Sequence, residues 1–119
     1  MIRTLSAAAC IVALTIVSAQ AAPMTKDGML VDDKGMTLYT FDKDEMGKSN
    51  CDAACLANWP AAKPMDGESA KGELSVITRA DGTKQWAYKG KPLYLWAKDA
   101  KPGDMTGDGI KGVWHVAKP

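Results

Sequence analysis

The chain has 119 residues, which suffice for one small domain. Its 15 basic residues nearly balance its 14 acidic residues, and the net charge is +1. No cluster of Lys or Arg lies beside an amphipathic helical pattern, so the composition argues against a protein that binds nucleic acid.

Residues 1–21 have the pattern of a secretory signal peptide. Arg3 supplies a positive charge, an uncharged apolar run follows at residues 7–17, and AQA at residues 19–21 has the small-x-small pattern of a signal peptidase site. We therefore expect cleavage after residue 21 and a periplasmic or secreted protein that comprises residues 22–119. Because the apolar run is too short to span a bilayer well, we expect no transmembrane span after the signal is removed.

Cys10 lies inside this signal and raises the question of a lipid anchor. A lipid-modified cysteine needs a Leu-like residue three positions earlier and an apolar core ahead of it. Ala7 holds that position instead, and most of the apolar core follows Cys10. We therefore interpret Cys10 as a small apolar residue of the signal.

The rest of the chain contains one sequence unit twice. The phrase LYTFDKD at residues 38–44 returns as LYLWAKD at residues 93–99, and further matches continue at the same offset to the end of both copies. The copies span about residues 27–64 and 81–119, joined by a linker rich in Gly, Ser, Lys and Glu. The repeated motif is Tyr39, Phe41 and Asp44 in the first copy, and Tyr94, Trp96 and Asp99 in the second.

Both copies begin with a predicted β hairpin. The turns contain Gly35 and Gly90, which can adopt the positive φ that tight hairpin turns require. A third turn at Gly82 adds a strand at residues 74–77, and a final strand is expected at residues 113–116. These patterns predict antiparallel pairing throughout.

The segment around the cysteines predicts one short helix. Ser49 or Asn50 is a candidate N-cap, and Pro60 stops any continuation. The fold class is therefore mainly β, with antiparallel hairpins from two tandem repeats that close on one core in a single small domain. The short helix lies near Cys51 and Cys55.

The motif has a simple structural interpretation. Residues two apart in a strand share a face, so Tyr39 and Phe41 point one way and Leu38 the other. Tyr94 and Trp96 occupy the equivalent positions. We expect these aromatic pairs to lie in the core, with an exposed ligand platform as the alternative. The two motif aspartates follow the strands, where a carboxylate can accept backbone N–H bonds and fix the exit turn.

These residues resemble a known family. The repeated Yx(F/W/Y)xxD motif occurs with CDAACLANWP, RADGTKQWAYKGKPLY and GVWHVAKP. Together they are similar to secreted repeat proteins of unknown function, described as predicted lipoproteins with this motif. The resemblance covers essentially all of residues 22–119. It implies an exported repeat protein and no particular activity, and the chain departs from lipid-anchored relatives in its poor lipidation site.

Cys51 and Cys55 are the strongest candidates for chemistry. An isolated cysteine pair in an exported protein usually forms a disulfide, and a spacing of four on a helix lies within reach of one. The alternative is a copper site formed by both thiolates and His115, the only histidine, with help from the scattered methionines. Methionine also fills gaps in cores, so we expect the disulfide and no cofactor.

Two further patterns carry weaker signals. DMTGDG at residues 104–109 begins like a calcium loop, but His115 holds the twelfth position, where a Glu is expected, so a plain turn is favoured. The signal for a hydrolytic triad is also weak, because no nucleophile motif frames a serine. His115 alternates with Trp114 on a strand, so the two side chains point to opposite faces.

Three hypotheses follow for the function. The first is a non-catalytic exported module that binds an unidentified ligand or envelope component. The second is a periplasmic copper-binding protein that uses Cys51, Cys55 and His115. The third is a small enzyme, which the thin inventory of catalytic residues disfavours.

Overall fold

The computed structural model of the chain describes residues 22–65 and 67–119. The predicted signal peptide, its cleavage site and Cys10 lie outside these residues. Within the described part, no helix is long and apolar enough to cross a membrane.

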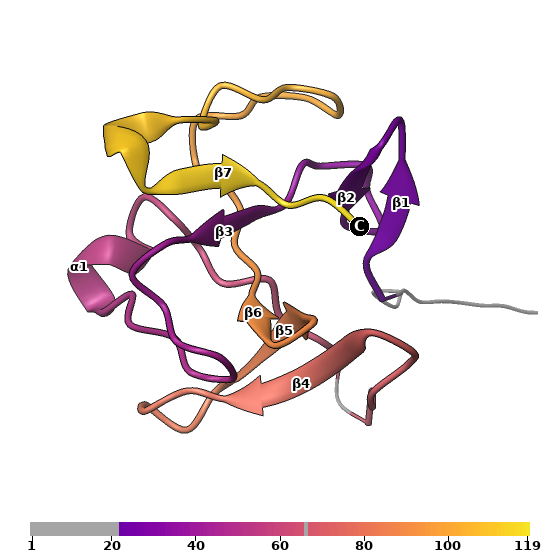
Figure 1. Cartoon of the computed structure of the whole chain (residues 1–119), viewed down its shortest axis with the longest axis vertical. Coiled ribbons are helices and arrows are strands. Elements are labelled where there is room, and N and C mark those ends of the chain that lie inside the picture. Colours follow the sequence, from indigo (N-terminus) through magenta and orange to yellow (C-terminus); the bar gives the residue numbers. More distant parts are fainter. Residues whose placement is uncertain (1–21, 66) are drawn as a thin grey trace, which may run out of the picture.

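The described chain is built from short antiparallel strands and two short helical turns (Figure 1). This confirms the predicted fold class. The elements are β1 (Met24–Lys26), β2 (Met29–Val31), β3 (Tyr39–Phe41), α1 (Ala53–Leu56), β4 (Leu74–Thr78), β5 (Lys84–Tyr88), β6 (Lys91–Pro92), the 3-10 turn η1 (Ile110–Gly112) and β7 (Trp114–Val116).

The two repeats meet at their motif tyrosines. The Tyr39 N–H donates to the Tyr94 carbonyl at 2.8 Å, and the Tyr94 N–H donates to the Tyr39 carbonyl at 2.9 Å. Because these residues hold equivalent positions in the two copies, the pair marks an approximate two-fold axis through the molecule. The strand pairings between the repeats follow this symmetry, since Tyr39 lies opposite Val116 and Tyr94 lies opposite Ala61.

Each repeat completes the sheet of the other. The Ala117 N–H donates to the Leu38 carbonyl at 2.8 Å, and in the equivalent contact the Ala62 N–H donates to the Leu93 carbonyl at 2.9 Å. In the same way β7, at the end of the second repeat, pairs antiparallel with β3 of the first (Figure 1). The C-terminal segments are therefore exchanged between the repeats.

The hydrophobic residues form two clusters rather than the single core expected from the sequence. Successive side chains of a strand point to opposite faces. Tyr39 and Tyr94 therefore enter one cluster with Trp59 and Trp114, while their neighbours Leu38 and Leu93 enter the other with Leu30 and Trp86. The predicted alternation within the motif is thus confirmed.

The predicted turns are present, and three local details differ from expectation. Gly35 and Gly90 have φ values of 83° and 84°, as tight turns require. The sequence reasoning missed β1, which is three exposed residues long. It also placed the N-cap of α1 wrongly, because the Asp52 side chain accepts the Cys55 N–H. Finally, the glycine-rich loop before β7 contains η1.

Candidate functional site

The motif aspartates bind the motif tyrosines of the opposite repeat. The Tyr39 hydroxyl donates to Asp99 Oδ2 at 2.6 Å, and the Tyr94 hydroxyl donates to Asp44 Oδ2 at 2.7 Å. Each aspartate also accepts a backbone N–H from the loop that follows it, as the sequence suggests. The Asn50 N–H donates to Asp44 at 2.6 Å. Each carboxylate therefore fixes its own loop and ties it to the other repeat.

Burial affects the protonation of these tyrosine–aspartate pairs, which form the symmetric frame of the protein. Both tyrosines are fully buried, and burial raises the pKa of Tyr39 and of Tyr94 far above the usual 10. Hydrogen bonds to Asp99 and Asp44 act in the same direction, because a nearby carboxylate disfavours a phenolate. Burial also raises the pKa of Asp44. The tyrosines are therefore held as neutral donors.

Four aromatic rings stack across the approximate two-fold axis. Trp59 and Trp114 form the centre, with ring centroids 3.8 Å apart and planes 1° from parallel. Phe41 stacks on Trp114 at 4.2 Å, and Trp96 stacks on Trp59 at 4.1 Å. The central rings are buried and the end rings are half-buried. This arrangement agrees with the core interpretation of the motif aromatics.

Gly107 shows how tightly the stack is enclosed. A Cβ atom at this position would lie 2.7 Å from the Trp59 ring and 2.9 Å from the Trp96 ring. The Gly107 N–H also donates to the Tyr39 hydroxyl at 3.2 Å. The motif residues and their neighbours therefore stabilise the fold, and little of their surface is available to a ligand.

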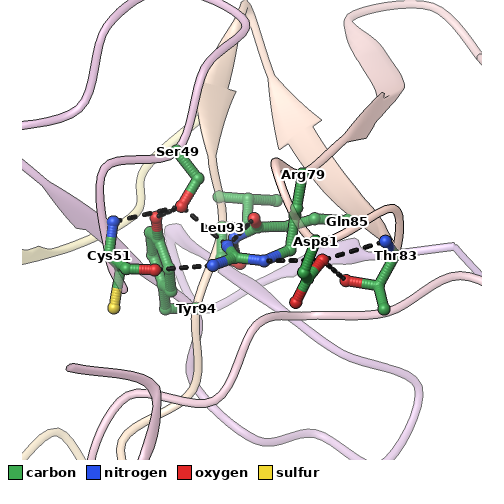
Figure 2. A network of polar contacts seen from close by, with 8 residues as sticks. All are labelled: Ser49, Cys51, Arg79, Asp81, Thr83, Gln85, Leu93 and Tyr94. Carbon is green, nitrogen blue, oxygen red and sulfur yellow. Dashed lines mark hydrogen bonds and ion pairs between the residues drawn. The ribbon is translucent and has the colours of Figure 1, made fainter. Parts of the chain in front are cut away.

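Arg79 breaks the symmetry of this frame. Its guanidinium lies between the repeats, where Nη1 donates to Ser49 Oγ and to Gln85 Oε1, both at 2.7 Å, and Nη2 donates to the Cys51 carbonyl (Figure 2). The Ser49 hydroxyl in turn contacts the Tyr94 hydroxyl at 2.5 Å. The arginine is thereby connected to one of the two tyrosine–aspartate pairs.

The first repeat offers no equivalent of this arginine. Strand register places Lys26 opposite Met29 at the end of the first hairpin, and Ile77 opposite Gln85 at the matching point of the second. The second hairpin continues beyond that point into a longer turn, and Arg79 lies in this extension. Buried Gln85 thus stands where the first repeat has apolar Met29.

The disulfide is the second feature found in one repeat only. Cys51 and Cys55 are bonded to each other, with Cα atoms 5.2 Å apart. Asp52 between them caps α1 by accepting the Cys55 N–H at 3.0 Å. The equivalent positions of the second repeat are Thr106 and Ile110, which cannot form such a bridge. The disulfide therefore shapes only the loop beside Arg79.

Both asymmetric features line one cleft of about 430 Å³. A larger hollow of about 760 Å³ lies beside the linker, but none of the described residues that line it is buried. The smaller cleft includes the buried Arg79 and the exposed Lys48, Asp52 and Asp81. Its lining comprises residues 48–53, Leu56 and residues 79–81.

Arg79 Nε is an unusual group in this cleft wall. Among the buried side-chain nitrogen and oxygen atoms of the described residues, it alone has no hydrogen-bond partner. Asp81 Oδ1 lies 3.9 Å from this nitrogen, too far for a hydrogen bond (Figure 2). Thr83 holds that carboxylate through its hydroxyl at 2.6 Å and its N–H at 2.9 Å, and these contacts keep the pKa of Asp81 below its usual range.

The residues of the expected copper alternative are used elsewhere. Cys51 and Cys55 are oxidised, and His115 Nε2 contacts Asp42 Oδ2 at 2.7 Å across β3 and β7. Within residues 22–65 and 67–119, no group of three or more His, Cys, Asp or Glu side chains is arranged to hold a metal ion.

The calcium-like loop is occupied by its own contacts. The Asp104 carboxylate accepts the Ala100 N–H at 2.8 Å and contacts Lys101 Nζ at 2.7 Å. Asp108 Oδ1 accepts the Val116 N–H at 3.0 Å, which fixes the loop to β7. The favoured interpretation as a structural turn agrees with these bonds.

Sequence reasoning found the motif and the disulfide but missed the residues around the cleft. Arg79, Gln85 and Ser49 lie outside the repeated Yx(F/W/Y)xxD motif, although Arg79 and Gln85 fall within the segment RADGTKQWAYKGKPLY. The available signal was a difference between the copies: the polar stretch RADGTKQW has a much shorter counterpart in the first repeat.

Two sequence-related units that exchange strands within one β domain define a tandem-repeat protein. The chain belongs to a family described as a secreted repeat of unknown function, whose profile matches residues 22–63 and 75–118. This confirms the resemblance inferred from the motif. No match is found among curated proteins or among solved structures.

Proposed function

We propose that the protein is an exported, non-catalytic binding module whose ligand site is the cleft beside Arg79 and the disulfide. One observation carries this proposal: Arg79 and the disulfide, each without a counterpart in the other repeat, meet at this cleft. The features that the repeats share, namely the tyrosine–aspartate pairs and the aromatic stack, stabilise the fold instead. A frame that is symmetric by duplication needs no asymmetric cleft for its own stability.

The chemistry of the cleft favours binding over catalysis. Its hydroxyl group, Ser49 Oγ, is held between Arg79 Nη1 and the Tyr94 hydroxyl. The only histidine, His115, lies on β7, where it contacts Asp42, and it does not line the cleft. A nucleophilic serine needs an adjacent general base, which this arrangement does not supply. The proposed module also needs no resident metal or cofactor.

We propose further that the protein acts outside the cytoplasm and without a lipid anchor. The support is the family's description as secreted, the AQA site at residues 19–21 and the poor lipidation site at Cys10. The intact mass of the exported protein should correspond to residues 22–119 with one disulfide. A diacylglyceryl group on Cys10 would contradict this part of the proposal.

The binding site is tested by mapping small-molecule fragments on the full exported protein with amide NMR shifts. We expect the shifted amides to concentrate at residues 48–56 and 79–81. Ala80→Trp should block the cleft from its exposed wall and remove these shifts. Ala100→Trp introduces the same bulk at an exposed position outside the cleft and should preserve them. Shifts that gather instead in the hollow beside the linker would contradict the assignment.

A further inference from the structure

The buried charge of Arg79 has no hydrogen-bonded carboxylate. Its side chain is 7 % exposed, and its three acceptors are a hydroxyl, an amide oxygen and a backbone carbonyl, all neutral. Burying a cation is costly unless an anion pairs with it. The guanidinium is thus held firmly in place while its charge is only partly compensated.

Asp81 lies beside the guanidinium but does not complete the pairing. Its Oδ1 atom is 3.9 Å from Nε, because Thr83 binds that same oxygen twice. The Asp81 side chain is 55 % exposed, so it can turn into solvent without crossing the protein. The Arg79 Nε–H therefore has no acceptor, and the Asp81 carboxylate in front of it is only weakly held. Another carboxylate can replace Asp81 at this position.

We propose that the cleft binds a monoanionic ligand, and that a carboxylate on this ligand displaces Asp81 to accept the Arg79 Nε–H. This inference rests on the proposed binding function and specifies its ligand class. Guanidinium binds carboxylates through strong, directional hydrogen bonds, and burial increases their strength.

The walls of the cleft restrict the rest of the ligand. Ala53, Leu56 and Ala80 provide apolar surface beside the arginine, which suits a small apolar group next to the carboxylate. Lys48 adds a positive charge at the cleft, whereas Asp52 adds a negative charge that disfavours polyanions. A peptide carboxyl end and a short aliphatic acid share this chemistry.

The test uses the full exported protein and observes the Arg79 Nε–H directly by NMR. Two probes represent the two sources of the carboxylate: N-acetyl-Ala-Ala for a peptide end, and hexanoate for an aliphatic acid. Their methyl esters have the same apolar parts without the charge. We expect at least one acid to shift the Nε–H signal in a saturable way, and its ester to bind at least about tenfold more weakly, as loss of a charge-assisted bond predicts.

Two variants separate the charge contact from general binding. Asp81→Asn keeps an oxygen for Thr83 but removes the competing charge, so affinity for the acid should rise roughly threefold to tenfold. Asp104→Asn is the matched control: this aspartate is also ion-paired and accepts backbone N–H bonds, but lies outside the cleft, so affinity should not change. Arg79→Lys keeps a positive charge but removes the Nε–H and the fixed guanidinium, so the difference in affinity between acid and ester should become smaller.

The outcomes distinguish this inference from the binding function beneath it. If acid and ester shift the cleft amides with equal affinity, the cleft binds but the carboxylate contact is wrong. If Asp81→Asn weakens binding of the acid, Asp81 contacts the ligand instead of competing with it, and the inference also fails. If neither acid shifts the Nε–H signal while uncharged fragments still bind at residues 48–56, the binding function stands and the ligand class is refuted.

Discussion

The exchange of tyrosine–aspartate pairs between the repeats makes a quantitative prediction for Tyr39→Phe. The substitution keeps the ring and its packing, so it opens no cavity. It removes the hydroxyl that donates to Asp99 at 2.6 Å and accepts the Gly107 N–H at 3.2 Å. A hydrogen bond to a charged group contributes about 1.5–3 kcal/mol, and buried Asp99 loses one of its partners. We therefore expect the free energy of unfolding to fall by roughly 2–3 kcal/mol.

This loss is measurable by denaturant and thermal unfolding. For a domain of this size, a change of 2–3 kcal/mol corresponds to a decrease in Tm of roughly 10–20 °C. The decisive measurement is a double-mutant cycle of Tyr39→Phe with Asp99→Ala, in which residues in direct contact should show a coupling of about 1–3 kcal/mol.

The matched control is the cycle of Tyr39→Phe with Asp44→Ala, the aspartate of the same repeat. Asp44 bonds to Tyr94 and not to Tyr39, so this coupling should stay below about 0.5 kcal/mol. If the same-repeat cycle shows the larger coupling, each repeat pairs with itself and the exchanged architecture is refuted.

The remaining predictions concern pH, packing and connectivity. The pKa values of Tyr39 and Tyr94 are higher in the folded protein than in the unfolded chain, so the unfolded chain releases these protons first. The resulting stability is fully present below about pH 10 and is lost at higher pH. Unfolding free energies that stay constant from about pH 8 to about 12 would contradict this prediction. Trp96→Ala should lower the free energy of unfolding by about 2–4 kcal/mol, since it removes one end of the aromatic stack; an unchanged Tm would show that this ring is a surface feature. Cleavage at a protease site inserted between residues 65 and 73 should leave the two halves associated in size-exclusion chromatography, because each completes the other's sheet; separation of the halves without denaturant would exclude that interlocking.

Much of the fold is encoded in local patterns that the sequence displays openly. The alternation of Leu38, Tyr39 and Phe41 predicts which side chains share a face, and Gly35 and Gly90 mark the turns by a backbone requirement. The pairing partner of each strand could not be predicted in this way. A repeat offset shows which positions are equivalent, but not whether a copy pairs with itself or with its neighbour. The β1 strand escaped notice because it is short, exposed and not apolar.

The cleft was harder to predict than the fold. Arg79 is one basic residue in a polar turn, and its burial depends on Ser49, Gln85 and the Cys51 carbonyl, which come from separate parts of the chain. No local spacing encodes such a meeting. Comparison of the two copies shows where they differ, but only the three-dimensional pairing shows that the differences adjoin each other.

The exchanged C-terminal segments also constrain the order of events during synthesis. The Leu30 N–H donates to the Ala117 carbonyl, which lies far along the chain, and β3 can pair only after β7 has been made. Contacts between such distant residues form slowly, since a long loop must close before they are gained. Until then the first repeat has an open strand edge, which can pair with another nascent chain. A chain that lacks residues 114–119 would remain in this aggregation-prone intermediate. Because β7 pairs with β3, loss of the last strand of the second repeat would first destabilise the first repeat.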